Sequence, residues 1–480
     1  MPEQRPLYAA IDLGSNSFHM LLVHERGGHA QTVAKIKRKV RLAAGLDGDY
    51  QLSREAMERG WDCLRLFAER LADVPKSNLR IVATATLRLA GNADVFLAEG
   101  ARILGHPIDV ISGLDEASLI YQGVAHTAGQ CGRRLVVDIG GASTELVVGE
   151  NFTPELLNSL EMGCVTFHER HFADGALDSA RFDLAVADAM TRLAPVRDSY
   201  LGLGWDHCVG ASGSVQAVQE VQLARGEDEE VTLARLERTL ADTIACGHMD
   251  SLSLPGLAED RKPVFAAGLA ILIAIFRSLG INTMQASGGA LREGIIYGLL
   301  PAPSLDVRSR TLASLEERFS LDSRQGALVS ALARQLAGAM DDNGLALLDA
   351  AARLHELGLA VGFKGAARHG AYLLEHLELP GFSQVDRRIL VALVGQQSGP
   401  INWSKIPASR RQLLLCHRLA VMFCGRRQPL PIHAFSLVQK EKGWLLRLPE
   451  GWLARHPLIS GQLQEECDRL RVEGLHLDLN

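Results

Sequence analysis

The sequence predicts an α/β fold whose first 302 residues are two copies of one unit, followed by a helical region and a small β-rich end. Two apolar segments joined by a glycine-containing turn occur at residues 9–23 and again at residues 135–148. Two such hairpins at a long interval indicate a duplicated domain. From residue 308 the pattern is helical throughout, and from residue 429 short stretches alternate like strands around a tryptophan-bearing turn.

Length and composition indicate a multi-domain globular protein. The chain has 480 residues, with 47% hydrophobic and 22% charged residues, and its net charge of −6 argues against sequence-independent nucleic-acid binding. The eight cysteines are dispersed without a C-x-x-C pair, as expected for reduced thiols in a cytosol. The longest apolar run, residues 264–276, is too short to span a bilayer and predicts a buried helix. We therefore expect a cytoplasmic protein with no membrane or nucleic-acid partner.

The first hairpin carries a turn suited to phosphate. Asp12 ends its first strand, and the turn that follows leaves backbone N–H groups accessible because glycine has no Cβ. A serine hydroxyl adds a further donor. The residues expected to bind phosphate here are Gly14, Ser15, Asn16 and Ser17.

A basic segment follows, with five Lys or Arg residues at positions 35–41. Lysines blunt the edge of a sheet, so the segment fits a solvated edge strand. It fits equally well a positive wall that faces a polyanionic substrate.

The next strand, residues 79–83, leads into hydroxyl residues and an arginine. This combination suits an oxyanion because guanidinium pairs bidentately with phosphate. We expect Thr86 and Arg88 to bind phosphate; the alternative is a surface arginine in a turn.

A helix that follows residue 112 carries a glutamate in its first turn. The strand at residues 108–111 leads into this helix, for which Asp115 is the predicted N-cap. The helix dipole favours an ionised carboxylate at Glu116, which would then act as a base at neutral pH. Glutamate is also common at helix starts for stability alone.

The second hairpin repeats the layout of the first, with Asp138 at the position of Asp12 and two glycines in its turn. The residues expected to bind phosphate in this turn are Gly140, Gly141, Ala142 and Ser143. Glu145 follows Asp138 by seven residues. Two carboxylates that face a bound oxyanion make chemical sense only with a hard cation such as Mg²⁺ between them. A plain Gly-Gly hairpin turn is the alternative.

Two further turns end apolar strands, at residues 209–214 and 284–294. Their small residues permit close approach of a ligand, and strand ends are where open α/β sheets bind ligands. The residues expected to contact a nucleotide or a phosphate chain are Ser212, Gly213, Ser214, Gly288 and Gly289. Each turn could instead be a tight connection.

A Pro-Ala-Pro-Ser segment at residues 301–304 marks a domain boundary. With the changes of pattern it predicts four domains, at residues 1–120, 121–302, 303–426 and 427–480.

The paired hairpins resemble those of the superfamily of actin, sugar kinases and Hsp70-type ATPases, whose two ribonuclease-H-like halves clamp polyphosphate between paired loops. Five segments also match, in order, the motifs of the exopolyphosphatase/guanosine pentaphosphate phosphohydrolase family, and this resemblance covers essentially the whole chain. The segments are residues 10–20, 111–113, 138–145, 210–213 and 287–294. Residues 36–46 and 83–90, with Ala142, are most similar to the pentaphosphate phosphohydrolase branch.

The resemblance implies two ribonuclease-H-like domains, an all-α domain related to His-Asp phosphohydrolases, a small fourth domain and a homodimer. It implies hydrolysis of the terminal 5′-phosphate of guanosine 5′-triphosphate 3′-diphosphate (pppGpp) to ppGpp, with slow trimming of inorganic polyphosphate as a side activity. Glu116 falls on the family's catalytic glutamate, and Asp138 and Glu145 match its cation-associated carboxylates. His355-Glu356 departs from the His-Asp pair, so we expect no second active site.

Together these residues suggest a hydrolytic mechanism in which both turns hold phosphate and Arg88 adds positive charge. Glu116 would orient the attacking water. The residues expected to position Mg²⁺ are Asp12, Asp138 and Glu145. Exopolyphosphatase activity is one alternative. A small-molecule kinase of the same superfamily would transfer phosphate to an acceptor, and a non-catalytic alarmone or polyphosphate sensor would bind without turnover.

Overall fold

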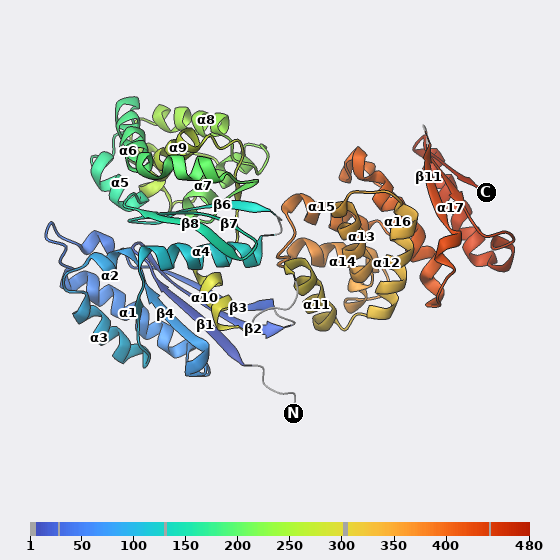
Figure 1. The fold of residues 1–480 in the computed structure, drawn as a ribbon, viewed down its shortest axis with the longest axis horizontal. Helices are drawn as coiled ribbons and strands as arrows, with labels where there is room; N and C mark the ends of the chain where they lie inside the picture. The colour runs from blue at the N-terminus through green and yellow to red at the C-terminus, as the bar shows by residue number, and fades with distance from the viewer. Residues whose placement is uncertain (1–5, 27–28, 129–131, 301–305, 441–442) are drawn as a thin grey trace. The chain divides into compact units, whose positions relative to one another are not determined.

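The computed structural model describes residues 6–26, 29–128, 132–300, 306–440 and 443–480. The chain divides into two compact units, Met1–Ser304 and Leu305–Asn480 (Figure 1). The Pro-Ala-Pro-Ser segment of the predicted boundary lies outside the described residues.

Two five-stranded sheets are found among the described residues of the first unit. Their strands are β1 (Leu7–Leu13), β2 (Ser17–Arg26), β3 (His29–Lys39), β4 (Leu79–Ala83), β5 (Asp109–Val110), β6 (Arg133–Ile139), β7 (Thr144–Glu150), β8 (Thr153–Leu160), β9 (His207–Gly210) and β10 (Gln285–Ala286). The strand orders are β3-β2-β1-β4-β5 and β8-β7-β6-β9-β10. In each sheet the first three strands are antiparallel and the other two pair in parallel. This repeated topology confirms the predicted α/β fold with a duplicated domain.

Helices cover both sheets and fill the space between them (Figure 1). The outer face of the first sheet packs on α1 (Arg54–Arg70) and α3 (Ala93–Leu104). The outer face of the second sheet packs on α5 (Cys164–His171), α6 (Ser179–Leu203), α7 (Gly213–Ala224), α8 (Leu233–Ala245) and α9 (Lys262–Leu279). Between the sheets lie α4 (Gly113–Thr127) and α10 (Leu291–Leu299). Alternate strand residues face opposite cores: Ile11 packs toward α1, whereas Ala10 packs toward α4.

Helix α9 contains the long apolar run. It is apolar and long enough to cross a membrane, but 72% of that stretch is buried within the structure. Its side chains form the centre of the core beneath the second sheet. The prediction of a buried core helix is confirmed.

The two central helices cross at a pair of glycines. A Cβ on Gly123 of α4 would lie 1.9 Å from the carbonyl oxygen of Ala290, and one on Gly294 of α10 would lie 1.8 Å from that of Leu119. Only glycine permits this approach of the two backbones. The crossing therefore fixes α4, which carries Glu116, relative to both sheets.

The second unit is a helical assembly with a three-stranded sheet. Its helices are α11 (Val307–Phe319), α12 (Ser323–Ala337), α13 (Asp342–Leu354), α14 (Ala366–His376), α15 (Gln384–Gly395), α16 (Arg411–Phe423) and α17 (Pro457–Val472). Its strands are β11 (Ser436–Lys440), β12 (Gly443–Arg447) and β13 (His476–Leu479). The three short strands confirm the predicted β-rich end. The interpretation omitted α17, which packs against these strands in a core shared with the helices.

The finer division into four domains stays a prediction. The predicted boundary after residue 120 falls within α4. The one after residue 426 falls within a compact unit whose hydrophobic core includes both Phe423 and Phe435.

The seven cysteines in the described part of the chain are free thiols, as predicted, and Cys131 lies outside it.

Candidate active site

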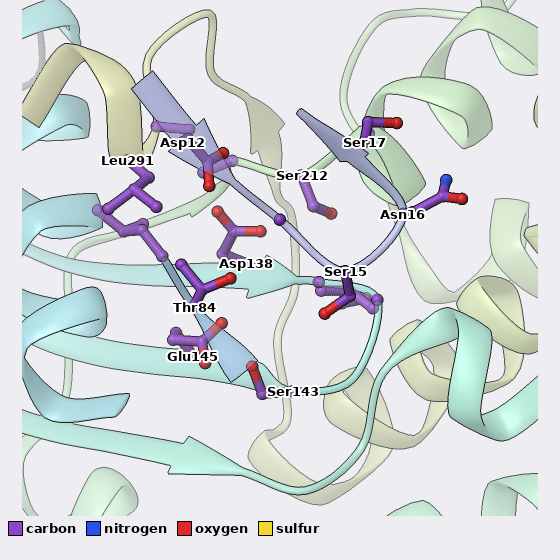
Figure 2. Close-up of a pocket in the computed structure, with 18 of the residues that line it drawn as sticks. Asp12, Ser15, Asn16, Ser17, Thr84, Asp138, Ser143, Glu145, Ser212 and Leu291 are labelled. Atoms are coloured by element: carbon purple, nitrogen blue, oxygen red, sulfur yellow. The ribbon is translucent and has the colours of Figure 1, made fainter. Parts of the chain in front are cut away.

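The two glycine-containing turns meet at one pocket of about 280 Å³ (Figure 2). A Cβ on Gly141 would lie 2.9 Å from the Cβ of Ser15 and 3.6 Å from the backbone nitrogen of Asn16, so the turns touch face to face. The pocket brings together all the turn residues predicted to bind phosphate: Gly14, Ser15, Asn16, Ser17, Gly140, Gly141, Ala142 and Ser143.

Hydrogen bonds on the outside of each turn orient its peptide groups. In the first turn, the Ser15 carbonyl accepts from the N–H of Ala43 at 3.0 Å, and the Asn16 carbonyl accepts from that of Arg41 at 2.9 Å. In the second turn, N–H groups of α5 bind the carbonyls of Gly140 and Gly141. Because a trans peptide points its C=O and N–H in opposite directions, binding the carbonyls outside turns the following N–H groups inward. Each turn thus presents backbone donors to the pocket.

Carboxylates from both hairpins share the pocket. Asp138 of β6 pairs in register with Glu145 of β7, and Asp12 of β1 pairs with His19 of β2. Residues directly opposite each other in an antiparallel pair project on the same face. Figure 2 shows the carboxyl groups of Asp12 and Asp138 pointing toward each other. Ser159 donates a hydrogen bond of 2.7 Å to Oε1 of the buried Glu145.

Glu116 lies in the same pocket, at the start of α4. The predicted N-cap is wrong: Ser112 caps the helix, and Asp115 completes a capping box from the third helical position. Oε2 of Glu116 accepts a hydrogen bond of 3.2 Å from Arg88, whose guanidinium also donates to the Ile111 carbonyl at 2.8 Å.

The helix dipole does not set the ionisation of Glu116, so that part of the prediction is wrong. Burial and the neighbouring carboxylates of Glu145 and Asp12 raise its pKa well above the ordinary value, against the opposite effect of Arg88. Burial, with Glu145 and Asp12 nearby, also raises the pKa of Asp138 from 3.8 to about 7. Burial and mutual repulsion thus both oppose ionisation of these carboxyl groups.

These neighbouring carboxyl groups fit a divalent cation, which would offset their mutual repulsion. Oδ1 of Asp12 is buried and has no hydrogen-bond partner within the described residues. No group of three or more His, Cys, Asp or Glu side chains in the described part of the chain is arranged to enclose an ion. Mg²⁺ commonly keeps several waters and takes only one or two protein carboxylates together with substrate phosphates. One or two of the carboxylates of Asp12, Asp138 and Glu145, together with water and a substrate phosphate, therefore suit Mg²⁺.

Replacing Asp138 by Asn is expected to stabilise the metal-free protein above pH 7. A carboxyl whose pKa is raised in the folded state binds its proton more tightly there than in the unfolded chain. The destabilising effect of Asp138 on the folded state is absent below pH 3.8, the pKa of this carboxyl in the unfolded chain. The effect grows as the pH rises and is complete above about pH 7, the pKa in the folded state. Thermal unfolding in EDTA at pH 8 should give a Tm higher by about 2 °C or more in Asp138→Asn, with little difference at pH 4. A variant less stable than wild type at pH 8 would contradict the unfavourable ionisation of Asp138 in the folded protein.

Basic groups line the same pocket. Lys37 comes from edge strand β3, and Arg261 and Arg292 from the second half of the unit. Neither arginine side chain makes an ion pair or hydrogen bond with any other described residue. Burial, together with Arg261, lowers the pKa of Lys37. The basic segment combines features of both alternatives. It forms an edge strand, on which Lys39 donates to the carbonyl of Asp260 at 2.7 Å, and another of its lysines, Lys37, lines the pocket.

Several predicted residues lie elsewhere. Ser212 and Gly213 line the pocket, whereas Ser214, Gly288 and Gly289 do not. A Cβ on Gly289 would meet Thr127 of α4 at 2.2 Å, so this glycine serves helix packing. Thr86 is buried within α2 (Ala85–Leu89), and Thr84 lines the pocket in its place. Arg88 does not line the pocket, but it donates a hydrogen bond to Glu116, which does.

Sequence interpretation missed His19, Thr84, Gln216, Arg261 and Arg292 as pocket residues. The duplication could have identified His19, because it follows Asp12 by the seven residues that separate Glu145 from Asp138. Arg292 lies within a segment already recognised as a motif. Arg261 precedes an apolar helix and carries no local pattern, so only the fold reveals it.

Comparisons with known proteins identify the family of the chain. The Ppx/GppA phosphatase family model matches residues 21–302, and the model of Ppx/GppA phosphatase domain III matches residues 307–467. A guanosine-5'-triphosphate,3'-diphosphate pyrophosphatase of Aeromonas hydrophila is 49% identical over 484 residues, covering 98% of this chain and 98% of the relative. One from Vibrio cholerae is 49% identical over 477 residues, covering 97% and 96%. The crystal structure of an exopolyphosphatase from Cytophaga hutchinsonii shares the fold, with a TM-score of 0.56 and 21% identity over 61% of this chain and 97% of its own. The chain therefore belongs to the Ppx/GppA phosphatase family.

Proposed function

We propose that this protein hydrolyses the terminal 5′-phosphate of pppGpp to give ppGpp and phosphate. The observation that carries the proposal is the meeting of the two turns at one pocket that also contains Glu116. The near-full-length relatives named guanosine-5'-triphosphate,3'-diphosphate pyrophosphatase support the choice of substrate.

The backbone donors of the two turns hold and orient the terminal phosphates. Phosphoryl transfer depends on alignment and on charge stabilisation at the equatorial oxygens more than on covalent chemistry. Amide groups fixed in advance by outside hydrogen bonds need no reorganisation as charge moves in the transition state. The guanidinium groups of Arg261 and Arg292, which pair with no other described side chain, line the pocket and supply positive charge there.

Glu116 acts on the water. Its Oε2 is bound by Arg88, which leaves Oε1 to accept a hydrogen bond from water. As the water oxygen bonds to the terminal phosphorus, the bond from phosphorus to the bridging oxygen breaks and one water proton passes to Glu116. A carboxylate of raised pKa is a better base for this step than an ordinary one.

The proposed cofactor is Mg²⁺, held by Asp12, Asp138 and Glu145 with the substrate. When bound it would neutralise charge on the phosphate oxygens. All other contributions to the reaction come from the turns, the arginines and Glu116.

Hydrolysis of inorganic polyphosphate is a second candidate activity. It is favoured by three basic residues that line the pocket, Lys37, Arg261 and Arg292, of which Lys37 also lies 3.9 Å from a carboxylate oxygen of Asp260. A chain of phosphates can extend along these groups without any base recognition.

Phosphate release from pppGpp, long-chain polyphosphate and GTP, compared side by side with Mg²⁺, tests the proposal. We expect the highest kcat/KM on pppGpp, lower activity on polyphosphate and the lowest on GTP. Faster release from GTP or from polyphosphate than from pppGpp would overturn the substrate assignment. EDTA should abolish the activity, and Mg²⁺ should restore it.

The same assay separates two rival functions. A small-molecule kinase would release no phosphate without an acceptor. A sensor would bind pppGpp without turnover, although Glu116 in the pocket argues for chemistry.

We also propose a cytoplasmic homodimer. Free thiols at the seven described cysteines fit a reducing compartment. Sedimentation analysis of the full chain tests the oligomeric state: a mass near 104 kDa, about twice that of the 52.0 kDa chain, is expected.

A further inference from the structure

Helix α5 holds the second turn from outside the pocket. The N–H of Cys164 donates to the carbonyl of Gly140 at 2.9 Å, and that of Val165 donates to the carbonyl of Gly141 at 2.8 Å. The approach is close, because a Cβ on Gly163 would lie 2.3 Å from the carbonyl oxygen of Gly141. The direction of the turn's inward N–H groups therefore depends on where α5 begins.

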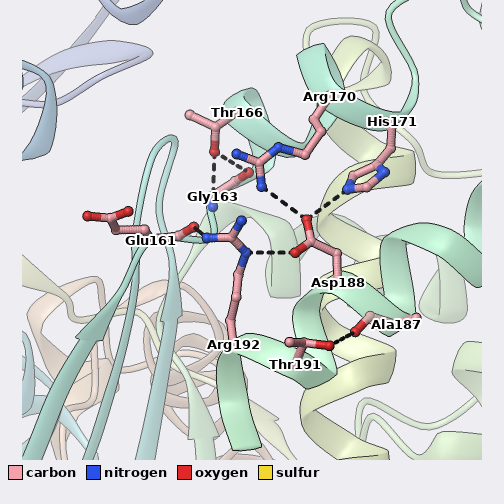
Figure 3. Close-up of polar contacts among 9 residues, drawn as sticks. All are labelled: Glu161, Gly163, Thr166, Arg170, His171, Ala187, Asp188, Thr191 and Arg192. Atoms are coloured by element: carbon pink, nitrogen blue, oxygen red, sulfur yellow. Dashed lines mark hydrogen bonds and ion pairs between the residues drawn. The ribbon is translucent and has the colours of Figure 1, made fainter. Parts of the chain in front are cut away.

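An ion-pair network centred on Asp188 of α6 fixes both ends of α5 (Figure 3). Oδ2 of Asp188 accepts from Arg170 and from His171, each at 3.0 Å, in the last turn of α5. Oδ1 accepts from Nε of Arg192 at 2.9 Å, and Nη1 of Arg192 donates to the carbonyl of Glu161 at 2.8 Å. Glu161 lies two residues before Gly163, in the bend that leads into α5.

The network joins two charged groups that are only partly exposed, Asp188 and Arg192, with Arg170, whose side chain is 49% exposed. The Asp188 side chain is 23% exposed and that of Arg192 27%. Burial acts to raise the pKa of Asp188, but hydrogen bonds from His171, Arg170 and Arg192 outweigh it and lower the pKa below the ordinary value. Asp188 is therefore anionic at neutral pH.

Apolar burial also holds α5 in place. Phe167, in the middle of the helix, is fully buried in the core beneath the second sheet. Apolar burial of this size holds a short helix in place. The specific effect of Arg192 is thus on the bend before α5, because it alone of the partners of Asp188 binds the Glu161 carbonyl.

We propose that Asp188 and Arg192 are positioning residues for the reaction: through the bend at residues 161–163 they set the direction of the N–H donors in the turn Gly140–Ser143. The inference rests on the proposed phosphatase function. A donor displaced by a fraction of an ångström still contacts the ground-state phosphate but stabilises the transition state less. Loss of the Arg192 contact should accordingly lower kcat more than it raises KM.

Arg192→Ala and Arg170→Ala make a matched pair. Each substitution removes one donor to Asp188 and one guanidinium that lies near the Phe167 ring, at 5.7 Å for Arg192 and 5.9 Å for Arg170. Only Arg192→Ala also removes the donor to the Glu161 carbonyl. We expect Arg192→Ala to lose about tenfold or more in kcat with less than about threefold change in KM, and Arg170→Ala to stay within about twofold of wild type. Arg192→Lys, which can reach one partner but not both in the same geometry, should recover part of the kcat.

Amide hydrogen exchange of residues 140–143 gives a second readout that needs no turnover. Faster exchange there in Arg192→Ala than in Arg170→Ala, at equal Tm, supports the proposal. Equal kcat and equal exchange in the two variants would overturn it and show a merely structural network. If wild type released no phosphate from any substrate, the proposed function would fail, and the exchange comparison alone would decide the positioning of the turn.

Discussion

Replacing Glu116 by Gln is expected to lower kcat by about 10²–10⁴-fold, the usual range for loss of a positioned base. Glutamine keeps the shape and the hydrogen bond with Arg88 but cannot take a proton from water. It also removes one of several mutually repelling carboxyl groups, so the variant should be at least as stable as wild type. Single-turnover phosphate release, with pppGpp binding by calorimetry, separates the loss of chemistry from any loss of affinity.

Asp115→Asn is the control for Glu116→Gln. Asp115 is the adjacent carboxylate on the same helix, but it faces solvent and serves the capping box with Ser112. Its replacement should cost about 1 kcal/mol of stability or less and leave kcat within about threefold of wild type. A Glu116→Gln enzyme that binds substrate and turns over within about tenfold of wild type would show that another group orients the water.

Gly294→Ala is expected to have the largest effect on stability. The added Cβ would meet the carbonyl oxygen of Leu119 at 1.8 Å and the backbone nitrogen of Gly123 at 3.1 Å, so α4 and α10 must move apart. Backbone cannot rotate away as a side chain can, and overpacking of this kind costs about 1–3 kcal/mol or more. Since α4 carries Glu116 and lies between the sheets, activity should fall as well. Thermal unfolding and phosphate release measure the two effects.

Gly298→Ala is the matched substitution on the same helix. It is one turn further along, exposed, and has no atom within 4 Å of the added Cβ. Its Tm should equal or exceed that of wild type, because alanine reduces the freedom of the unfolded chain. Equal stability of the two variants would mean that the glycine crossing is not tight in solution.

The duplicated half of the fold was predictable because its pattern is local. A strand, an aspartate and a small-residue turn can be recognised from consecutive residues, and two copies predict two similar sheets. Asp12 and Asp138 occupy equivalent strand ends, so their meeting followed from the pairing of the halves. Helix α17 was missed because its neighbours alternate like strands and the pattern at residues 457–472 was not treated separately.

The electrostatics of the site could not be predicted from local sequence. The helix start at Glu116 favours a charged carboxylate, but burial raises the pKa of Glu116, and the carboxylates of Glu145 and Asp12, which come from β7 and β1, raise it further. Arg261 reaches the pocket from a segment with no phosphate-binding pattern. Thr84 lines the pocket where Thr86 was expected. The two threonines lie two residues apart, and the sequence alone does not show which of their side chains points toward the pocket.

A crystal structure of the Glu116→Gln variant with pppGpp and Mg²⁺ tests the central claim most directly. We expect the terminal phosphates within hydrogen-bond distance of backbone N–H groups from both turns, Gly14–Ser17 and Gly140–Ser143, with residue 116 beside the terminal phosphorus. Phosphates held by one turn alone, or residue 116 on the far side of the nucleotide, would contradict it.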